Sequence, residues 1–252
     1  MIIDSHSHYD DERFSSDREQ VLLDLKNHNV EKIINVGYDL QSSENAVMLA
    51  NKYDFIYAAV GFHPSDAAGF TEGAKNRLIE LTKNEKVIAW GEIGLDYHYD
   101  NIDKELQKEV FIQQMKLAKE LNLPVSIHTR DAMADTLEIV KKYQTPGVFH
   151  CYSGSLEIAK ELVKIGYYIS FSGTVTYKNA KNVKEVATWI PEDKYLIETD
   201  CPYLSPEPVR GKRNDSRNLN YTAQHIAELR NVSLEQVVRE SCENTKRLFG
   251  IV

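Results

Sequence analysis

The hydrophobic residues of this chain fall into short runs separated by longer stretches with helical periodicity. Short apolar runs bounded by polar residues are typical of buried strands. Between them, Val110, Phe111, Met115 and Ala118 recur at the spacing of one helical face. Strands that alternate with helices predict parallel βαβ units. The expected strands are Ile2–Ser5, Lys32–Val36, Ile56–Val60, Val87–Ile93, Val125–His128, Gly147–His150, Tyr167–Ser170 and Tyr195–Thr199.

Eight such units in 252 residues predict an α/β protein, a single (β/α)8 TIM barrel with its active site at the C-terminal ends of the strands. The competing fold is an open doubly wound sheet, whose ligands would gather at one switch point instead of following most strands. No linker, internal repeat or low-complexity segment interrupts residues 1–252, so we expect one domain. A long loop, 201–218, is expected to follow the last strand, and helices over 221–230 and 233–249 to close the chain.

Composition indicates a globular protein, with 42% hydrophobic and 27% charged residues. No apolar run reaches the length of a membrane span, so no membrane partner is expected. The N-terminus enters the first expected strand at once, without the basic region of a secretory signal. The three cysteines lack a CxxC pair and are expected to be reduced thiols in the cytoplasm. The oligomeric state is left open, and a monomer is compatible with the sequence.

A net charge of −8 argues against non-specific binding of polyanions over the whole surface. It does not exclude a phosphate substrate, because metal ions and a few local arginines can reverse the sign of the charge inside one cleft.

Polar residues that suit metal ions stand at the downstream ends of several expected strands. Histidine and carboxylate together suit divalent transition metals, and six such ligands are more than one tetrahedral zinc ion needs. We therefore expect two divalent metal ions in a hydrolytic enzyme, with the metal (Mg, Mn, Zn, Co, Ni or Fe) left open. The expected ligands are His6, His8, Glu92, His128, His150 and Asp200.

The ligands are expected to divide between two ions. His6 and His8, two residues apart on one strand, point to the same face and are expected to share an ion with Asp200. His128 and His150 are expected to hold the second ion, and Glu92 to bridge both. The alternatives are ordinary ones: a hydrogen-bonded histidine at a strand end, or a carboxylate in a salt bridge.

Other polar residues near these ligands have more than one possible role. Asp4 is expected either to orient a ligand histidine or to be a hydrogen-bonded core group. His63 ends the third expected strand and is expected to contact the substrate, with a ligand, an acid for the leaving group and a structural role as alternatives. Asp96 is expected to shape the pocket or to be solvated. Glu198, one layer below Asp200, is expected to be buried, hydrogen-bonded and structural.

The loop after the eighth strand is basic, from Arg210 to Arg217. Charge runs are usually solvated, but this loop often helps form phosphate sites in such barrels, and guanidinium groups match phosphate oxygens. Arg210, Lys212 and Arg213 are therefore expected to bind the substrate.

Short motifs that contain the candidate residues run in order over nearly the whole chain. They are Asp4-Ser5-His6-Ser7-His8, Gly61-Phe62-His63-Pro64, Gly91-Glu92-Ile93-Gly94-Leu95-Asp96-Tyr97, His128-Thr129-Arg130, His150-Cys151-Tyr152-Ser153-Gly154, Glu198-Thr199-Asp200-Cys201-Pro202-Tyr203-Leu204 and Arg210-Gly211-Lys212-Arg213-Asn214. Together these motifs resemble those of the TatD family of metal-dependent deoxyribonucleases, within the amidohydrolase-like barrels. Two positions depart from the family pattern: Asp215-Ser216 stands where the family commonly has Glu-Pro, and Ser7 replaces a frequent Cys.

The resemblance implies a barrel with two metal ions that hydrolyses DNA phosphodiester bonds, often as a 3′-to-5′ exonuclease. Single-stranded DNA or DNA 3′ ends, or another phosphodiester, would then be the substrate. We expect Asp200, Glu92 and His63 to be the catalytic residues, with Asp200 accepting a proton from the attacking water. The alternatives are a binuclear amidase, lactonase or esterase, and a non-catalytic metal- or nucleic-acid-binding module.

Overall fold

The computed structural model describes residues 1–99 and 103–251, and its eight strands neighbour one another in chain order. The strands are β1 (Ile2–Ser7), β2 (Val30–Val36), β3 (Ile56–Val60), β4 (Val87–Asp96), β5 (Val125–Arg130), β6 (Gly147–Phe149), β7 (Tyr168–Phe171) and β8 (Tyr195–Ile197). The α-helices are α1 (Arg18–Asp24), α2 (Leu40–Lys52), α3 (Glu72–Leu81), α4 (Lys104–Glu120), α5 (Met133–Tyr143), α6 (Leu156–Lys164), α7 (Lys181–Trp189), α8 (Leu219–Arg230) and α9 (Leu234–Phe249). Short 3-10 helices are η1 (Glu12–Phe14), η2 (Leu25–His28), η3 (Pro64–Gly69), η4 (Gly173–Thr176), η5 (Glu207–Val209) and η6 (Ser216–Asn218).

An α-helix follows every strand, which is the element order of a (β/α)8 barrel. Strands β3 to β6 pair in parallel, as do β7 and β8. Ser7, at the end of β1, forms a parallel bridge with Cys201, which follows β8. The predicted fold class is therefore confirmed. A doubly wound sheet, whose strands leave chain order at a switch point, is excluded.

The chain divides into two compact units, which are described separately. Unit 1 comprises Met1–Ile34, His150–Lys164 and Tyr168–Val252, and unit 2 comprises Asn35–Phe149 and Ile165–Tyr167. The single domain expected over residues 1–252 stays a prediction, and its residues 100–102 and 252 lie outside the described residues.

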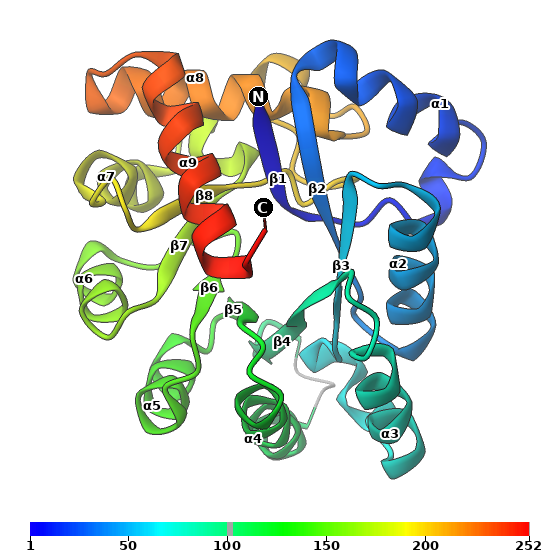
Figure 1. Ribbon diagram of the computed structural model, residues 1–252. Coiled ribbons are helices and arrows are strands. Elements are labelled where there is room, and N and C mark those ends of the chain that lie inside the picture. Colours follow the sequence, from blue (N-terminus) through cyan, green and yellow to red (C-terminus); the bar gives the residue numbers. More distant parts are fainter. Residues whose placement is uncertain (100–102, 252) are drawn as a thin grey trace. The chain divides into compact units, whose positions relative to one another are not determined.

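In unit 1, helix α9 packs against β1 and β8, and α8 packs against both α7 and α9 (Figure 1). The hydroxyl of Ser233 accepts the backbone N–H of Gln236 and caps the start of α9. Gly250 ends the helix with φ of 67°, in the left-handed region that glycine adopts without strain. The buried face of α9 includes Val237 and Phe249, and the helix covers the hydrophobic strands β1 and β8.

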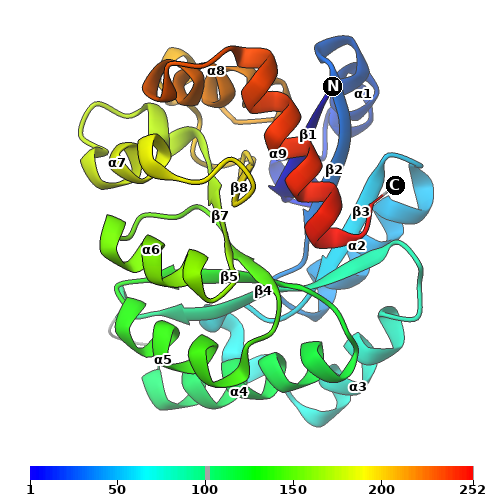
Figure 2. The ribbon, with the colours of Figure 1, turned by 60° about the vertical axis from the view of Figure 1, so that its left-hand side comes forward.

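In unit 2, helix α4 packs on β4 and lies between α3 and α5 in both views (Figure 1 and Figure 2). Two buried glutamines on α4, seven residues apart and hence on one face, bind backbone next to candidate site residues. The amide of Gln107 binds both the N–H and the carbonyl of Asp96, at 2.8 and 2.9 Å. The amide of Gln114 does the same for Phe62, at 2.9 Å each, and its oxygen also accepts the indole N–H of Trp90. Helix α4 therefore fixes the ends of β3 and β4.

Strands β4 and β5 approach closely at Gly94, which pairs with His128. Gly94 has φ of 145°, and a Cβ atom there would lie 1.9 Å from the carbonyl oxygen of His128. Only glycine allows this backbone conformation and this approach together. The residue thereby places Glu92, two positions earlier, beside the strand that carries His128.

Among the residues that the structure describes, no helix is long and apolar enough to cross a membrane. Cys151, Cys201 and Cys242 are free thiols, as predicted.

Candidate metal centre

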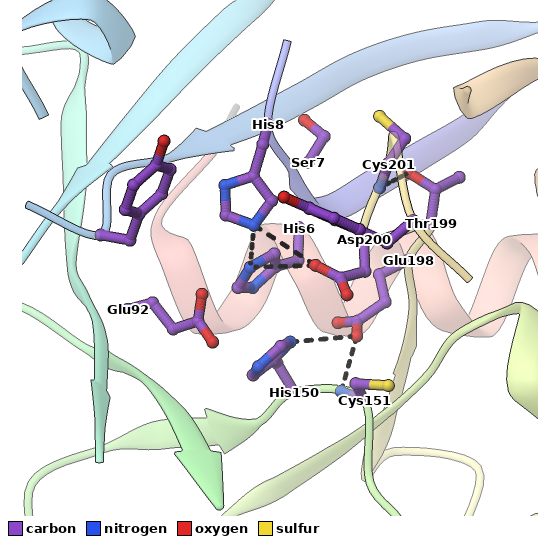
Figure 3. Close-up of polar contacts among 12 residues, drawn as sticks. His6, Ser7, His8, Glu92, His150, Cys151, Glu198, Thr199, Asp200 and Cys201 are labelled. Carbon is purple, nitrogen blue, oxygen red and sulfur yellow. Dashed lines mark hydrogen bonds and ion pairs between the residues drawn. The ribbon is translucent and has the colours of Figure 1, made fainter. Parts of the chain in front are cut away.

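In unit 1, His6, His8 and Asp200 direct their side chains toward one point (Figure 3). The Nε2 atoms of His6 and His8 are 3.1 Å apart. The Oδ1 atom of Asp200 lies 3.3 Å from Nε2 of His8 and 3.8 Å from Nε2 of His6. The backbone N–H of Asp200 donates to the carbonyl of His6, which fixes the residue after β8 against β1. Strand alternation explains why His6 and His8 converge, as predicted.

The geometry of these three atoms fits a metal ion. Ligands at roughly 2.1 Å from an ion, 90–110° apart, are separated from one another by roughly 3.0–3.4 Å. The separations of 3.1 Å between His6 and His8 and 3.3 Å between His8 and Asp200 fall within this range. The separation of 3.8 Å between His6 and Asp200 is wider. Two imidazoles and one carboxylate also suit a divalent transition metal. The residues present therefore fit the ion that the sequence predicts.

His150 follows β6 directly and lies against His6 in unit 1. The two rings are stacked, with centroids 4.0 Å apart and planes 15° apart. The Nδ1 atom of His150 is 3.4 Å from Oε1 of Glu198 (Figure 3). One donor atom from each of His6, His150 and Glu198 lies within 4.8 Å of the others, so these residues form a second group suited to a metal.

Asp4, fully buried one layer below, holds this part of unit 1 together through four hydrogen bonds. Its carboxylate accepts the backbone N–H and hydroxyl of Thr199, the hydroxyl of Ser216 and the backbone N–H of His6. Burial raises the pKa of Asp4 to about 7, although these hydrogen bonds oppose the increase. Asp4 is therefore a hydrogen-bonded core group, which is one of its two expected roles. Its contact with the backbone N–H of His6 also holds that residue in place.

In unit 2, a third group of candidate ligands surrounds Glu92. The Oε1 atom of Glu92 lies 3.0 Å from Nδ1 of His128 and 3.8 Å from Nε2 of His63. The rings of His63 and His128 are in edge contact, with centroids 4.4 Å apart. The other nitrogen of His128, Nε2, lies 3.2 Å from the carboxylate of Asp96. Asp96 is only 4% exposed, so the alternative of a solvated loop residue is wrong.

The Nδ1 atom of His63 contacts Ser65 twice. It accepts the backbone N–H of Ser65 at 3.1 Å and caps the short helix η3, and it lies 2.6 Å from the hydroxyl of Ser65, which itself donates to Asp66. A neutral imidazole whose Nδ1 is an acceptor holds its proton on Nε2, the nitrogen that faces Glu92, whereas one that donates to the hydroxyl holds it on Nδ1. The roles of His63 as a substrate contact, a ligand or an acid for the leaving group stay predictions.

Two of the carboxylates have a lowered pKa despite their burial. Burial raises the pKa of Asp200, but the hydrogen bond from His8 and the charges of His8, His6 and His150 outweigh it. For Asp96, burial is likewise outweighed by hydrogen bonds from His128 and from the backbone of His98. Both groups are therefore ionised at neutral pH, which metal ligation requires.

Most of the charge on the basic loop of unit 1 is paired. Arg213 donates two hydrogen bonds to Asp17, at 2.8 and 2.7 Å, and its guanidinium lies over the ring of Phe14. Arg210 pairs with Glu207 at 3.0 Å and is 59% exposed. Lys212 is exposed. The role of these residues as substrate contacts stays a prediction, and a phosphate at Arg213 would compete with Asp17.

Some proposed relationships join residues of the two units and stay predictions. These are the bridging role of Glu92 and the shared ion of His128 and His150. The sequence did not predict the contact between Asp96 and His128. The available signal was strand alternation, because Asp96 and Glu92 are separated by an even number of positions along β4 and side chains at such positions share one face of a regular strand. Gln107 and Gln114 lacked any signal beyond their helical spacing, because a glutamine on a helix is usually exposed.

Comparison with known proteins shows similarity over nearly the whole chain. Residues 3–250 match the family model described as TatD related DNase. The uncharacterized metal-dependent hydrolase YabD of Bacillus subtilis (strain 168) is 47% identical, and the alignment covers 100% of both chains. The uncharacterized metal-dependent hydrolase YcfH of Escherichia coli (strain K12) is 36% identical, over 100% of this chain and 96% of the relative.

Among solved structures, the crystal structure of YJJV, a TatD homolog from Escherichia coli K12, is 31% identical in sequence. It superimposes with a TM-score of 0.94, covering 100% of this chain and 98% of the other. This similarity extends over both units and confirms the barrel fold. The chain therefore belongs to the TatD family and is a metal-dependent hydrolase.

Proposed function

We propose that this protein is a deoxyribonuclease that hydrolyses DNA phosphodiester bonds from the 3′ end of a single strand. The observation that carries the proposal is the convergence of His6, His8 and Asp200 in unit 1, with donor separations that fit a divalent ion. The description of the matching family model, TatD related DNase, supports phosphodiester bonds as the target.

Two metal ions, held by the donor groups of unit 1 and unit 2, would supply positive charge that activates water and offsets charge on the phosphate. Asp200, whose carboxylate is ionised at neutral pH, accepts a proton from the attacking water. His6 and His8 orient Asp200 through their close contacts with it. His63 donates its Nε2 proton to the departing sugar oxygen, which otherwise leaves as a costly alkoxide.

Substrate contacts are proposed for the exposed cations of the loop after β8. Arg210 and Lys212 extend from the segment that follows Asp200, and both side chains are largely exposed. A phosphate bound by Arg210 would compete with its contacts to Glu207 and to the ring of Tyr177. Arg213 donates two hydrogen bonds to Asp17, and it would bind a phosphate by sharing its guanidinium between the carboxylate and the phosphate.

Hydrolysis at a carbonyl carbon, in an amide or lactone, is the second candidate. It is favoured by one observation: the arginines of the loop are paired with carboxylates, which weakens the attraction for phosphate. The same metal ligands serve either reaction, so only the substrate distinguishes the two.

The test is a substrate panel with protein reconstituted with Mn²⁺. Single-stranded oligonucleotides labelled at the 5′ or the 3′ end are compared with a lactone and an N-acyl amide at equal enzyme concentration. We expect cleavage of the oligonucleotides alone, with the 3′ label released first as a mononucleotide. Turnover of the lactone or amide with intact oligonucleotides would instead establish the second candidate and overturn the first.

A further inference from the structure

Glu198 is a fully buried carboxylate in unit 1, just ahead of Asp200, with 0% of its surface exposed. Burying an ionisable group is costly unless partners compensate for lost water. Its Oε1 accepts the backbone N–H of Cys151 at 2.6 Å, and the same oxygen lies 3.4 Å from Nδ1 of His150 (Figure 3). Its Oε2 has no hydrogen-bond partner within the described part of the chain.

The contact with Cys151 does not explain why the residue is acidic, because an amide oxygen would accept the same backbone N–H. The neighbour that distinguishes a carboxylate from an amide is His150, whose Nδ1 lies within ion-pair distance of Oε1 but outside hydrogen-bond geometry. Its ring can carry a proton on either nitrogen. A carboxylate beside Nδ1 favours the tautomer that is protonated there, and leaves the lone pair on Nε2.

The stacking of His6 on His150 completes the arrangement. The near-parallel rings, 15° apart with centroids separated by 4.0 Å, restrict rotation of the His150 ring out of its plane. The orientation of the His150 ring is therefore already restricted by His6. What Glu198 can still influence is which nitrogen of that ring holds the proton.

We propose that Glu198 is a positioning residue that keeps the proton of His150 on Nδ1, so that Nε2 is available to a metal ion. The inference rests on the proposed metal centre, and it gives Glu198, which also belongs to one group of possible ligands, a role that acts through His150. It assigns an electrostatic function to a residue that the sequence predicts to be structural.

The histidine of unit 2 with the closest carboxylates is arranged differently. His128 lies between two of them, with Nδ1 3.0 Å from Glu92 and Nε2 3.2 Å from Asp96. Because a carboxylate lies at each nitrogen, these contacts select neither tautomer of His128, and the inference concerns His150 alone.

The test compares Zn²⁺ affinity of the wild-type protein with that of Glu198→Gln, by competition with a chromophoric chelator. The substitution keeps the shape and the acceptor for Cys151 but removes the charge, and we expect about 10–100-fold weaker Zn²⁺ binding. The matched control is Glu240→Gln, a buried glutamate on α9 that accepts hydrogen bonds from Tyr195 and Gln236. The control should bind Zn²⁺ as the wild type does.

A second measurement uses the wild-type chain and does not depend on the folding of a variant. Nitrogen-15 NMR of the Zn²⁺-loaded protein, with the His150 signals assigned from their loss in His150→Asn, should show the proton on Nδ1. A proton on Nε2, or unchanged affinity in a folded Glu198→Gln protein, would overturn the inference. A wild-type protein that binds no Zn²⁺ would instead overturn the proposed metal centre itself.

Discussion

At the scale of single residues, the candidate site consists of histidines with a carboxylate neighbour. His8 contacts Asp200, His150 contacts Glu198, and His128 contacts both Glu92 and Asp96. The sequence singled out the histidines because each stands at the end of an apolar run. It did not identify Asp96 and Glu198 as their partners, because distances between side chains on different strands are not visible in a sequence.

His63 provides a prediction at this scale. If His63 is the proton donor proposed above, His63→Gln should slow the cleavage of DNA, whose leaving group needs protonation, by about 10²–10⁴-fold. Cleavage of bis(p-nitrophenyl) phosphate should change little, because p-nitrophenolate leaves without a proton. Steady-state kcat on the two substrates measures the difference, with His98→Gln, a histidine of unit 2 with a 44% exposed side chain, as control. An equal loss on both substrates would contradict the role of proton donor.

At the scale of elements, the periodicity of the sequence predicted the strands well and their ends less well. Strand β3 has the predicted bounds, while β4 continues to Asp96 and β6 ends at Phe149, so that His150 lies just beyond its strand. The two closing helices were predicted within two residues at their starts. The ends differ because hydrogen bonds to neighbouring elements, such as the two between Gln107 and Asp96, decide where a strand stops.

Helix α4 provides a prediction about stability and site geometry. Gln114→Ala leaves the N–H and carbonyl of Phe62 and the indole of Trp90 without their partner. We expect the free energy of unfolding to fall by at least about 2 kcal/mol, because each buried group left unpaired costs roughly 1–3 kcal/mol. Urea unfolding measures the change, and Gln113→Ala, an exposed neighbour on the same helix, is the control. Equal stability of the two variants would show that Gln114 does not fix β3.

The ion pair between Arg213 and Asp17 gives a pH-dependent prediction. The hydrogen bonds from Arg213 lower the pKa of Asp17, so the pair stabilises the folded state above the unfolded pKa of about 3.9. This contribution is lost as the pH falls through the lowered pKa. Arg213→Ala should therefore reduce the free energy of unfolding at pH 7 by less than about 1 kcal/mol, because both side chains are partly exposed. The difference should shrink at pH 3, and an equal difference at both pH values would contradict this account.

At the scale of the whole molecule, the family similarity extends over residues 3–250 and includes all the candidate ligands. Unit 1 supplies His6, His8, His150 and Asp200, and unit 2 supplies Glu92 and His128. The chain carries a net charge of −8, which repels DNA in the absence of metal ions. Metal ions would therefore be needed for binding the proposed substrate as well as for the reaction.

The most direct test measures cleavage of a labelled single-stranded oligonucleotide before and after metal is restored to chelator-treated protein. We expect no cleavage by the metal-free protein, cleavage after addition of Mn²⁺, and a rate at least about 100-fold lower in Asp200→Asn. Circular dichroism of the variant would confirm that it is folded. An intact oligonucleotide after incubation with fully metal-loaded wild-type protein, or equal cleavage without metal, would contradict the proposed function.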